Sequence, residues 1–349
     1  MKTNKWRRTA IFSFILMLIL SGCSLIGSNQ ENRSIDPPPE QESTELEETM
    51  SWGEEGDVGS DMPVTLYVKD AQDYVVPVTI RIPHSEGVAK QVLAYMVDQG
   101  PGMEQLPHGF TPILPAGTEV LGMDIIEDKN LAIVDFSEHF TSYNPGDERH
   151  LLEAVTWALT SYDAIDQVQI WVEGEPLKEM PVNGTPLDDA LTRAMGINLE
   201  KVDGVNLAQA SAVTLYFQNK TDDQMAYLVP VTRLVDYSDN LAEASMKQWL
   251  NGPLPLSSLI SLTAADTKLL GIQQAEGHIE VELDASVAAM TGGVVSEDLI
   301  QSIVLSLTET TGASHVQVMM GGKGAIQTDE GNVYASPVTR PTEVNSLEL

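Results

Sequence analysis

Histidine, cysteine and acidic side chains are the residues with which this chain could do chemistry, and the histidines are the first candidates for a metal centre. No two of the six lie three or four residues apart, as the ligands of a helical zinc motif do. None recurs at a corresponding position in the chain's two internal repeats. We therefore expect neither a metal centre nor a cofactor. The histidines are His84, His108, His139, His150, His278 and His315.

Two loops resemble parts of known ligand sites without completing them. The Gly-Gly-Lys-Gly run at 321–324 lacks both the spacing of a phosphate-binding loop and a helix directly after it, so we interpret it as a hairpin turn. The acidic run at 329–332 lacks the alternating ligands and the final Glu of a calcium loop, so we interpret it as a polar turn. The chain also has no GxSxG nucleophile motif.

Two acidic residues, Asp135 and Glu282, occupy corresponding positions in strand-like segments of the two repeats. A catalytic carboxylate needs a partner group and an environment that shifts its pKa. The alternation of each strand instead places both carboxylates on the face opposite their apolar neighbours, where they would be solvated. We interpret them as surface residues and predict that the chain is not an enzyme.

The one cysteine of the chain, Cys23, follows an apolar segment near the N-terminus. Residues 10–20 are almost all apolar, are preceded by four cations and are too few to span a bilayer, which indicates a signal peptide. The four residues that end at Cys23, LSGC, match the lipobox of bacterial lipoproteins. We predict a signal peptide over residues 1–22 and an acylated Cys23 that binds the lipid bilayer. The alternative is an ordinary signal peptide with an incidental cysteine.

Strong acidity characterises the mature chain. Removal of the four cations of the signal peptide leaves 15 Lys and Arg against 51 Asp and Glu, a net charge of about −36. Nucleic acid and anionic lipid surfaces are therefore poor partners for the body of the protein.

The stretch over residues 23–62 is predicted to be a disordered acidic tether. It is polar, contains three consecutive prolines and shows no apolar period. Its 39 residues after Cys23 would reach about 130 Å when fully extended. We expect the folded part to work at a distance from its membrane.

Beyond the tether the sequence repeats itself in the same order, which indicates a duplicated domain. Val-Thr-Leu-Tyr at 64–67 returns at 213–216, and Tyr-x-Val-Pro-Val-Thr at 74–79 returns at 227–232. The predicted domains cover residues 63–199 and 211–346, with a linker over residues 200–210.

Both copies predict the same elements. In the first copy a hairpin over 64–82 precedes a helix, a strand pair over 120–136, a second helix and a final strand over 168–172. Pro77 and Pro230 restrict the second hairpin strand of each copy to a sheet edge or a bulge. The predicted fold class is α+β, with two tandem copies of a β-β-α-β-β-α-β domain whose helices pack on a sheet.

The second helix of each copy follows a polar residue, Asp147 or Ser296, which we predict to be its N-cap. The apolar stripe of this helix returns at a constant offset of 148 residues. The helix is therefore the best-supported element of the predicted domain.

Each copy ends on the same polar pattern, a Thr-Arg pair followed by an asparagine. Arg193 is followed by Asn198, and Arg340 by Asn345. A guanidinium group can bind a carboxylate through paired hydrogen bonds, either in a partner or in its own domain. We identify these four residues as candidates for interaction or domain closure, and we expect them to pack each chain end onto its own domain.

This architecture resembles the GerM-like family, the sporulation and spore germination lipoproteins of endospore-forming Bacillus-type bacteria that carry two tandem GerMN domains. The resemblance rests on the lipobox at Cys23, the acidic tether, and the repeated Val-Thr-Leu-Tyr starts and Thr-Arg-x₄-Asn ends. These motifs are structural, so the resemblance assigns no catalytic residue. GerMN domains are likened to ring-building motifs, small α/β modules that oligomerise, so the resemblance implies such a fold and an oligomer.

The resemblance also implies a non-enzymatic role in sporulation and germination. The expected partners are protein components of the channel complex between mother cell and forespore, which this chain would help to assemble. The expected location is the extracytoplasmic face of the cell membrane, which in sporulating cells is the space between the two membranes. The alternative is an extracytoplasmic protein that binds a germinant or a peptidoglycan fragment between its two domains.

Overall fold

The computed structural model describes residues 61–85, 87–187, 189–202, 204–291 and 293–346. The predicted signal peptide, Cys23 and the predicted tether up to residue 60 lie outside the described residues. Within the described ranges, none of the helices combines the length and the apolar character that a membrane crossing needs.

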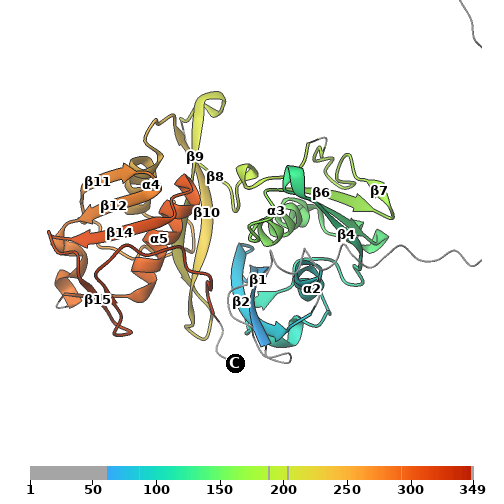
Figure 1. The fold of residues 1–349 in the computed structure, drawn as a ribbon, viewed down its shortest axis with the longest axis horizontal. Coiled ribbons are helices and arrows are strands. Elements are labelled where there is room, and N and C mark those ends of the chain that lie inside the picture. The colour runs from blue at the N-terminus through green and yellow to red at the C-terminus, as the bar shows by residue number, and fades with distance from the viewer. Residues whose placement is uncertain (1–60, 86, 188, 203, 292, 347–349) are drawn as a thin grey trace, which may run out of the picture. The chain divides into compact units, whose positions relative to one another are not determined.

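The first domain, residues 61–199, follows the predicted order of strands and helices (Figure 1). Its first strand begins at Asp61, two residues before the predicted start of the domain. Single turns of 3₁₀ helix fill the connections. The elements are β1 (Asp61–Asp70), β2 (Val75–Pro83), α2 (Val88–Tyr95), η1 (Met103–Gln105), β3 (Phe110–Thr111), β4 (Val120–Ile126), η2 (Glu127–Lys129), β5 (Leu131–Phe136), η3 (Glu138–Thr141), η4 (Pro145–Asp147), α3 (Glu148–Leu159), β6 (Gln167–Val172), β7 (Glu175–Pro176) and η5 (Arg193–Met195).

The second domain, residues 210–346, repeats this order. Between the domains, the segment predicted to be a linker contains a short strand and a 3₁₀ turn. The elements are β8 (Glu200–Lys201), η6 (Leu207–Gln209), β9 (Ala210–Lys220), β10 (Ala226–Asp236), α4 (Leu241–Leu250), β11 (Leu269–Ala275), β12 (His278–Leu283), η7 (Ala285–Thr291), β13 (Val294–Val295), α5 (Glu297–Thr311), β14 (His315–Met320), β15 (Ile326–Thr328) and β16 (Val333–Tyr334).

Each domain contains a hairpin sheet and a second sheet. The hairpin strands pair as β2-β1-β3 in the first domain and as β8-β10-β9 in the second, while the other strands form β4-β5-β6-β7 and β11-β12-β14. Strands β5 and β6, and likewise β12 and β14, are parallel because α3 and α5 cross between them. A small third sheet, β13-β15-β16, is added in the second domain.

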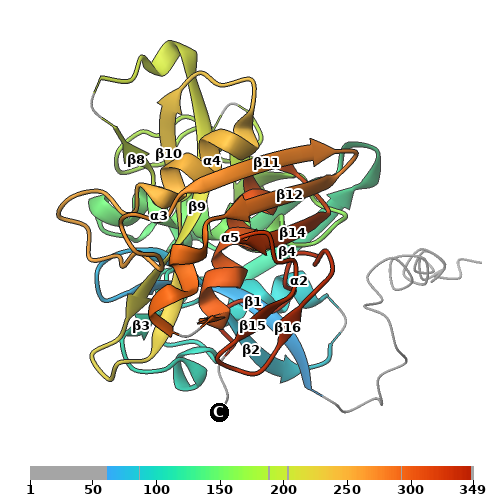
Figure 2. The same cartoon turned by 90° about the vertical axis from the view of Figure 1, so that its left-hand side faces the viewer.

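The helices α3 and α5 lie between the two sheets of their domains. Helix α3 contacts β1 and β6, and α5 contacts β9 and β14. Figure 2 shows the second domain from the side of β11, β12 and β14, with α5 behind these strands. Both helices are therefore buried nearly all round, and their side chains join the two sheets into one core. The predicted α+β fold with helices packed on a sheet is confirmed, and the hairpin forms a sheet of its own.

The predictions for individual positions differ in outcome. Ser296 caps α5 as expected, because its side chain accepts a hydrogen bond from the Leu299 N–H. Asp147 does not cap α3, because its carboxylate instead pairs with Lys69 Nζ at 2.8 Å. Strand β2 is an edge of its sheet, as Pro77 requires. Strand β10 is central, because β8 pairs with it in the two residues that lie three and four positions past Pro230.

Candidate functional site at the contact between the two domains

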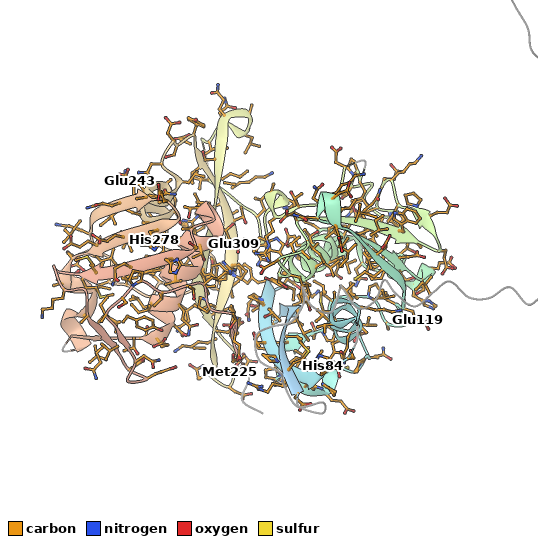
Figure 3. The ribbon with its side chains drawn as sticks, in the orientation of Figure 1. His84, Glu119, Met225, Glu243, His278 and Glu309 are labelled. Atoms are coloured by element: carbon orange, nitrogen blue, oxygen red, sulfur yellow. The ribbon has the colours of Figure 1, made fainter. Side chains whose placement is uncertain are left out.

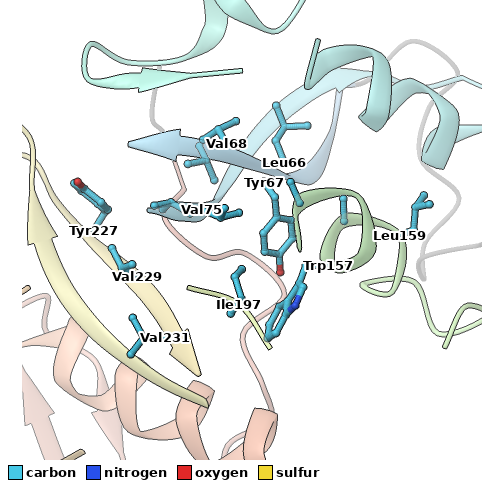
Figure 4. Close-up of a cluster of buried hydrophobic side chains, with 14 of the residues drawn as sticks. Leu66, Tyr67, Val68, Val75, Trp157, Leu159, Ile197, Tyr227, Val229 and Val231 are labelled. Carbon is cyan, nitrogen blue, oxygen red and sulfur yellow. The ribbon is translucent and has the colours of Figure 1, made fainter. Parts of the chain in front are cut away.

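The second hairpin strands, β2 and β10, contact each other across the boundary between the two domains. Figure 4 shows apolar side chains of both strands meeting here: Val75 from β2, and Val229 and Val231 from β10. Ile197, from the end of the first domain, lies between them, and all four side chains are fully buried. The two domains thus share a continuous apolar core at this contact.

Asn198 binds both domains at once. Its Oδ1 accepts a hydrogen bond from Val75 N–H at 2.8 Å, and its Nδ2 donates to the Val75 carbonyl at 2.8 Å. The same Nδ2 donates to the carbonyl of Pro230 in the second domain at 2.7 Å. One amide therefore satisfies three backbone groups of two facing strands.

Asn345 makes the same set of bonds with the domains exchanged. Its Oδ1 accepts from Leu228 N–H at 2.7 Å, and its Nδ2 donates to the Leu228 carbonyl at 2.8 Å. Its Nδ2 also donates to the carbonyl of Pro77 in the first domain at 2.7 Å. Leu228 and Pro77 are the repeat counterparts of Val75 and Pro230, so the contact has an approximate two-fold symmetry.

The residue before each asparagine pairs with the opposite domain through its backbone. Thr232 N–H donates to the Ile197 carbonyl at 2.8 Å, and Ile197 N–H donates to Thr232 Oγ1 at 3.0 Å. In the exchanged contact, Thr79 N–H donates to the Val344 carbonyl at 3.1 Å, and Val344 N–H donates to Thr79 Oγ1 at 3.0 Å. Each closing segment thus lies along the second hairpin strand of the other domain, beside β8 on β10 and along the free edge of β2. Each chain end thus packs onto its own domain, as expected, and it also binds the other domain, which the sequence did not predict.

Asparagine suits both positions for conformational as well as chemical reasons. Asn198 has φ +46° and Asn345 has φ +51°, in the left-handed region that most residues avoid. Asparagine enters this region more readily than other residues with a side chain, and its amide offers both a donor and an acceptor. Glycine could adopt the same backbone but would leave three backbone groups unpaired.

Both arginines bind one carboxylate, Glu309, near the end of α5. Arg193 Nη1 lies 2.9 and 2.8 Å from its two oxygens, and Arg340 Nη2 lies 2.7 Å from Oε2. The Glu309 side chain is only 8 % exposed, while Arg193 and Arg340 are 26 % and 32 % exposed. Arg193 therefore binds a carboxylate of the other domain, and Arg340 binds one of its own.

The surroundings of the two arginines follow the repeat. Arg193 Nε donates to Thr160 Oγ1 at 2.8 Å, and Arg340 Nη1 donates to the corresponding Thr308 Oγ1 at 3.1 Å. The Arg193 guanidinium also stacks over the Trp157 ring, 4.5 Å from its centroid. Glu309 has no acidic counterpart in the first domain, where Ser161 occupies the matching position. Glu309 is therefore a charge that breaks the symmetry of the contact and that both halves share.

Electrostatics favour the charged form of this triad. Burial alone would raise the pKa of Glu309, but the charges and hydrogen bonds of Arg340 and Arg193 outweigh it, so the pKa is lowered. Burial would lower the pKa of Arg340, but Tyr216 and then the negative charge of Glu309 outweigh it, so the pKa is raised. Glu309 therefore remains ionised at neutral pH, and the triad of Arg193, Arg340 and Glu309 joins the two domains through charged hydrogen bonds.

A second polar contact closes the other end of the boundary. The carboxylate of Asp70, which is buried in β1, accepts hydrogen bonds from Tyr227 Oη at 2.9 Å and from Asn219 Nδ2 at 3.2 Å. The ring of Phe110 meets the Tyr227 ring edge-on at 4.9 Å. Burial, and then the charge of Asp70, raise the pKa of Tyr227, so its hydroxyl stays a donor.

The other residues considered for chemistry have local structural contacts. Asp135 accepts a hydrogen bond from the Gly174 N–H at 3.0 Å, and Glu282 accepts one from the Gly322 N–H at 2.9 Å. Both carboxylates therefore hold the turn after the neighbouring strand of their own sheet. Asp329 accepts from the Glu297 N–H at 2.9 Å and so supports the start of α5.

The histidines do not form a site within the described ranges. His84 and His278 lie in different domains (Figure 3), and the described residues contain no group of three or more His, Cys, Asp or Glu that could hold a metal ion. His278 and His315 stack on adjacent strands at 4.6 Å between ring centroids.

Glu309 is the residue that sequence reasoning missed (Figure 3). The first domain has no acidic residue at the matching position, and the chain contains 51 acidic residues, so no sequence pattern distinguished Glu309 as a site residue. The two repeated arginines were the available signal, since two guanidinium groups at a buried contact need a counter-charge.

A sequence model of the Germane family, described as sporulation and spore germination, matches the chain twice, over residues 65–178 and 214–325. The chain belongs to the Germane family. The two matches contain the hairpin strands β2 and β10 that meet at the contact, and they end before the closing segments that carry Asn198 and Asn345.

Relatives of this Germane chain extend the match to nearly its whole length. It is 35 % identical to the spore germination protein GerM of Bacillus subtilis strain 168, over 94 % of each chain. Its structure is similar to that of the tandem GerMN domains of the sporulation protein GerM from Bacillus subtilis. That match has a TM-score of 0.75 and 38 % identity, and covers 82 % of this chain and 99 % of the other. These similarities support a role in sporulation and germination and confirm the predicted family.

Proposed function

We propose that this protein is a non-enzymatic, membrane-anchored assembly factor of the channel complex between mother cell and forespore. The observation that carries the proposal is the similarity to a sporulation protein over both domains and 94 % of the chain. In this proposal an acylated Cys23 holds the chain on the extracytoplasmic face of the membrane, and the tether gives the two domains reach.

The contact between the domains supports a role in placing other proteins. The asparagine pair, the crossed closing segments and the triad at Glu309 hold the domains as one body. A body with two fixed domains offers two surfaces at a constant spacing. Once one surface is bound, the other binds its target at a high effective concentration.

The receptor alternative receives less support from the geometry. It needs a cavity between the domains, but side chains such as Val75, Ile197 and Val229 fill that contact. Two surface hollows, beside Gly117 and beside Pro341, are each lined by residues of a single domain. A melting-temperature shift with germinants or peptidoglycan fragments would be evidence for the receptor.

The proposal is tested by deleting the gene in the sporulating source bacterium and imaging fluorescently tagged channel proteins. We expect channel proteins to lose their position at the forespore membrane and spore yield to fall, with rescue by the unaltered gene. Normal channel placement in the deletion strain would contradict the proposal.

A further inference from the structure

The sheet β4-β5-β6-β7 of the first domain has one face turned away from the core. Figure 1 shows α2 and α3 on the same side of this sheet. The core-facing residues of β5, such as Val134, are fully buried, and the residues that alternate with them are half-buried. Leu131 and Ile133 belong to this second set and are not part of the apolar core. We call this the open face of the first domain.

Apolar side chains of three strands gather on the open face. Ile126 of β4 is the register partner of Leu131, and Ile133 lies two residues further along β5. Trp171 of β6 lies on the same face, paired with Asp135. All four apolar residues are half-buried and lie outside the core. An aromatic ring beside three branched aliphatic chains is a composition typical of the centre of a protein interface.

The second domain provides an internal comparison, because its corresponding sheet is built on the same register. There the equivalents of Leu131 and Ile133 are His278 and Glu280, the equivalent of Ile126 is Ala275, and Trp171 alone has a large apolar equivalent, Met319. The fold therefore tolerates polar and charged residues at the positions of Leu131 and Ile133. Since the fold does not require them, the apolar residues of the first domain need another explanation.

The charge around the open face indicates the chemistry of its partner. Asp124 lies on the face beside Ile133, and Glu127 and Asp128 are exposed in the turn that follows β4, against the single cation of that turn, Lys129. In the described part of the chain, none of the three acidic residues forms an ion pair. A partner with Lys or Arg around an apolar patch would complement this surface, whereas an anionic lipid surface would be repelled.

We propose that the open face of the first domain is a docking site for a protein surface that combines an apolar patch with a basic rim. The inference rests on the proposed function, because it takes the partner to be a component of the channel complex. It also makes the two domains unequal: the first docks through apolar contact, and the corresponding face of the second does not.

The test exchanges the two faces within the full chain. The double variant Leu131→His with Ile133→Glu gives the first domain the residues that the second domain carries at the same register. The matched control, His278→Leu with Glu280→Ile, makes the reverse exchange in the second domain. Melting temperatures and circular dichroism of both variants check that the fold is retained.

The readouts are septal localisation of a fluorescent fusion in sporulating cells and crosslinking from a photoreactive amino acid at Gln169, which lies beside Ile133 on the open face. We expect the first-domain variant to lose localisation and at least about tenfold of the crosslinked product, as for an interface hot spot. The second-domain control should behave as the unaltered chain does.

Three results would overturn the inference. If the folded first-domain variant localises and crosslinks normally, the open face is not the docking site, while the proposed function stands. If the crosslink joins two copies of this chain, the occupant is a second copy and not a channel component. If the unaltered chain itself is not recruited, both the inference and the proposed function fail.

Discussion

The contribution of Asn198 to the contact between the domains can be measured by its replacement with alanine. Asn198→Ala removes three hydrogen bonds, two of 2.8 Å to the Val75 backbone and one of 2.7 Å to the Pro230 carbonyl. It also places an alanine at φ +46°, a conformation that asparagine adopts more readily. The variant should therefore lose stability through both the side chain and the backbone.

The magnitude follows from these two contributions. Three net hydrogen bonds at roughly 0.5–1.5 kcal/mol each sum to about 3 kcal/mol, and the left-handed backbone adds about 1 kcal/mol. We expect the free energy of unfolding to fall by about 3–5 kcal/mol. Asn198→Gly removes the same bonds without the backbone strain, so its loss of unfolding free energy should be about 1 kcal/mol smaller than that of Asn198→Ala.

Urea unfolding followed by tryptophan fluorescence is a suitable assay, because Trp157 and Trp249 are buried in the first and second domains. Asn345→Ala serves as the symmetric control and should cost a similar amount, since it makes the equivalent three bonds. Hydrogen exchange at the Val75 amide gives a local readout. A loss below about 1 kcal/mol with unchanged protection of that amide would show that Asn198 does not stabilise the contact.

Three further substitutions and a change of pH have defined outcomes. Glu309→Gln leaves Arg193 and Arg340 without a counter-charge and should lower the free energy of unfolding by about 2–3 kcal/mol. This is less than the usual loss for a buried ion pair, because both guanidinium groups are partly exposed. An unchanged free energy of unfolding would contradict the prediction. The pKa of Glu309 is lowered in the folded chain, so its contribution to the free energy of unfolding is present above about pH 4.5 and is lost as the pH falls through the lowered pKa. The difference in unfolding free energy between Glu309→Gln and the unaltered chain should therefore shrink in acid. A difference that stays constant with pH would count against the triad. Glu148→Gln should destabilise the first domain by about 1–3 kcal/mol, because the buried carboxylate accepts hydrogen bonds from a tyrosine hydroxyl and two backbone amides. Thermal unfolding measures this loss, and a melting temperature equal to that of the unaltered chain would contradict it. Cys23→Ala should release the chain from washed membranes into the medium, as fractionation and immunoblotting would show, and a membrane-bound variant would disprove the lipid anchor.

The elements of each domain could be predicted because their signals are local and are written twice. The alternating hairpins and the apolar stripe of α3 and α5 need only neighbouring residues, and the second copy checks the first. The N-cap predictions show where local reasoning fails. Ser296 caps α5, but a distant lysine on β1 takes the carboxylate of Asp147, and that contact depends on tertiary packing.

The candidate site could be predicted as a set of residues but not as a contact. The repeated arginines and asparagines indicated a shared role, yet their targets lie across the domain boundary, and that arrangement depends on how two cores pack. Pro77 and Pro230 were recognised by the N–H that each lacks, while the contact uses the carbonyl that each keeps. The crossed contacts, in which each closing segment binds the other domain, therefore depend on how the two domains pack together.

The two domains form one body if the contact between them is fixed, and a distance measured between the domains in solution decides this. The mature chain without Cys23 has no cysteine, so spin labels at cysteines placed at Asp128 and Asp222, exposed turn residues of the two domains, would report only the distance between them. We expect one narrow distance distribution that is unchanged by ionic strength at neutral pH. A broad or multiple distribution in the unaltered background would contradict it.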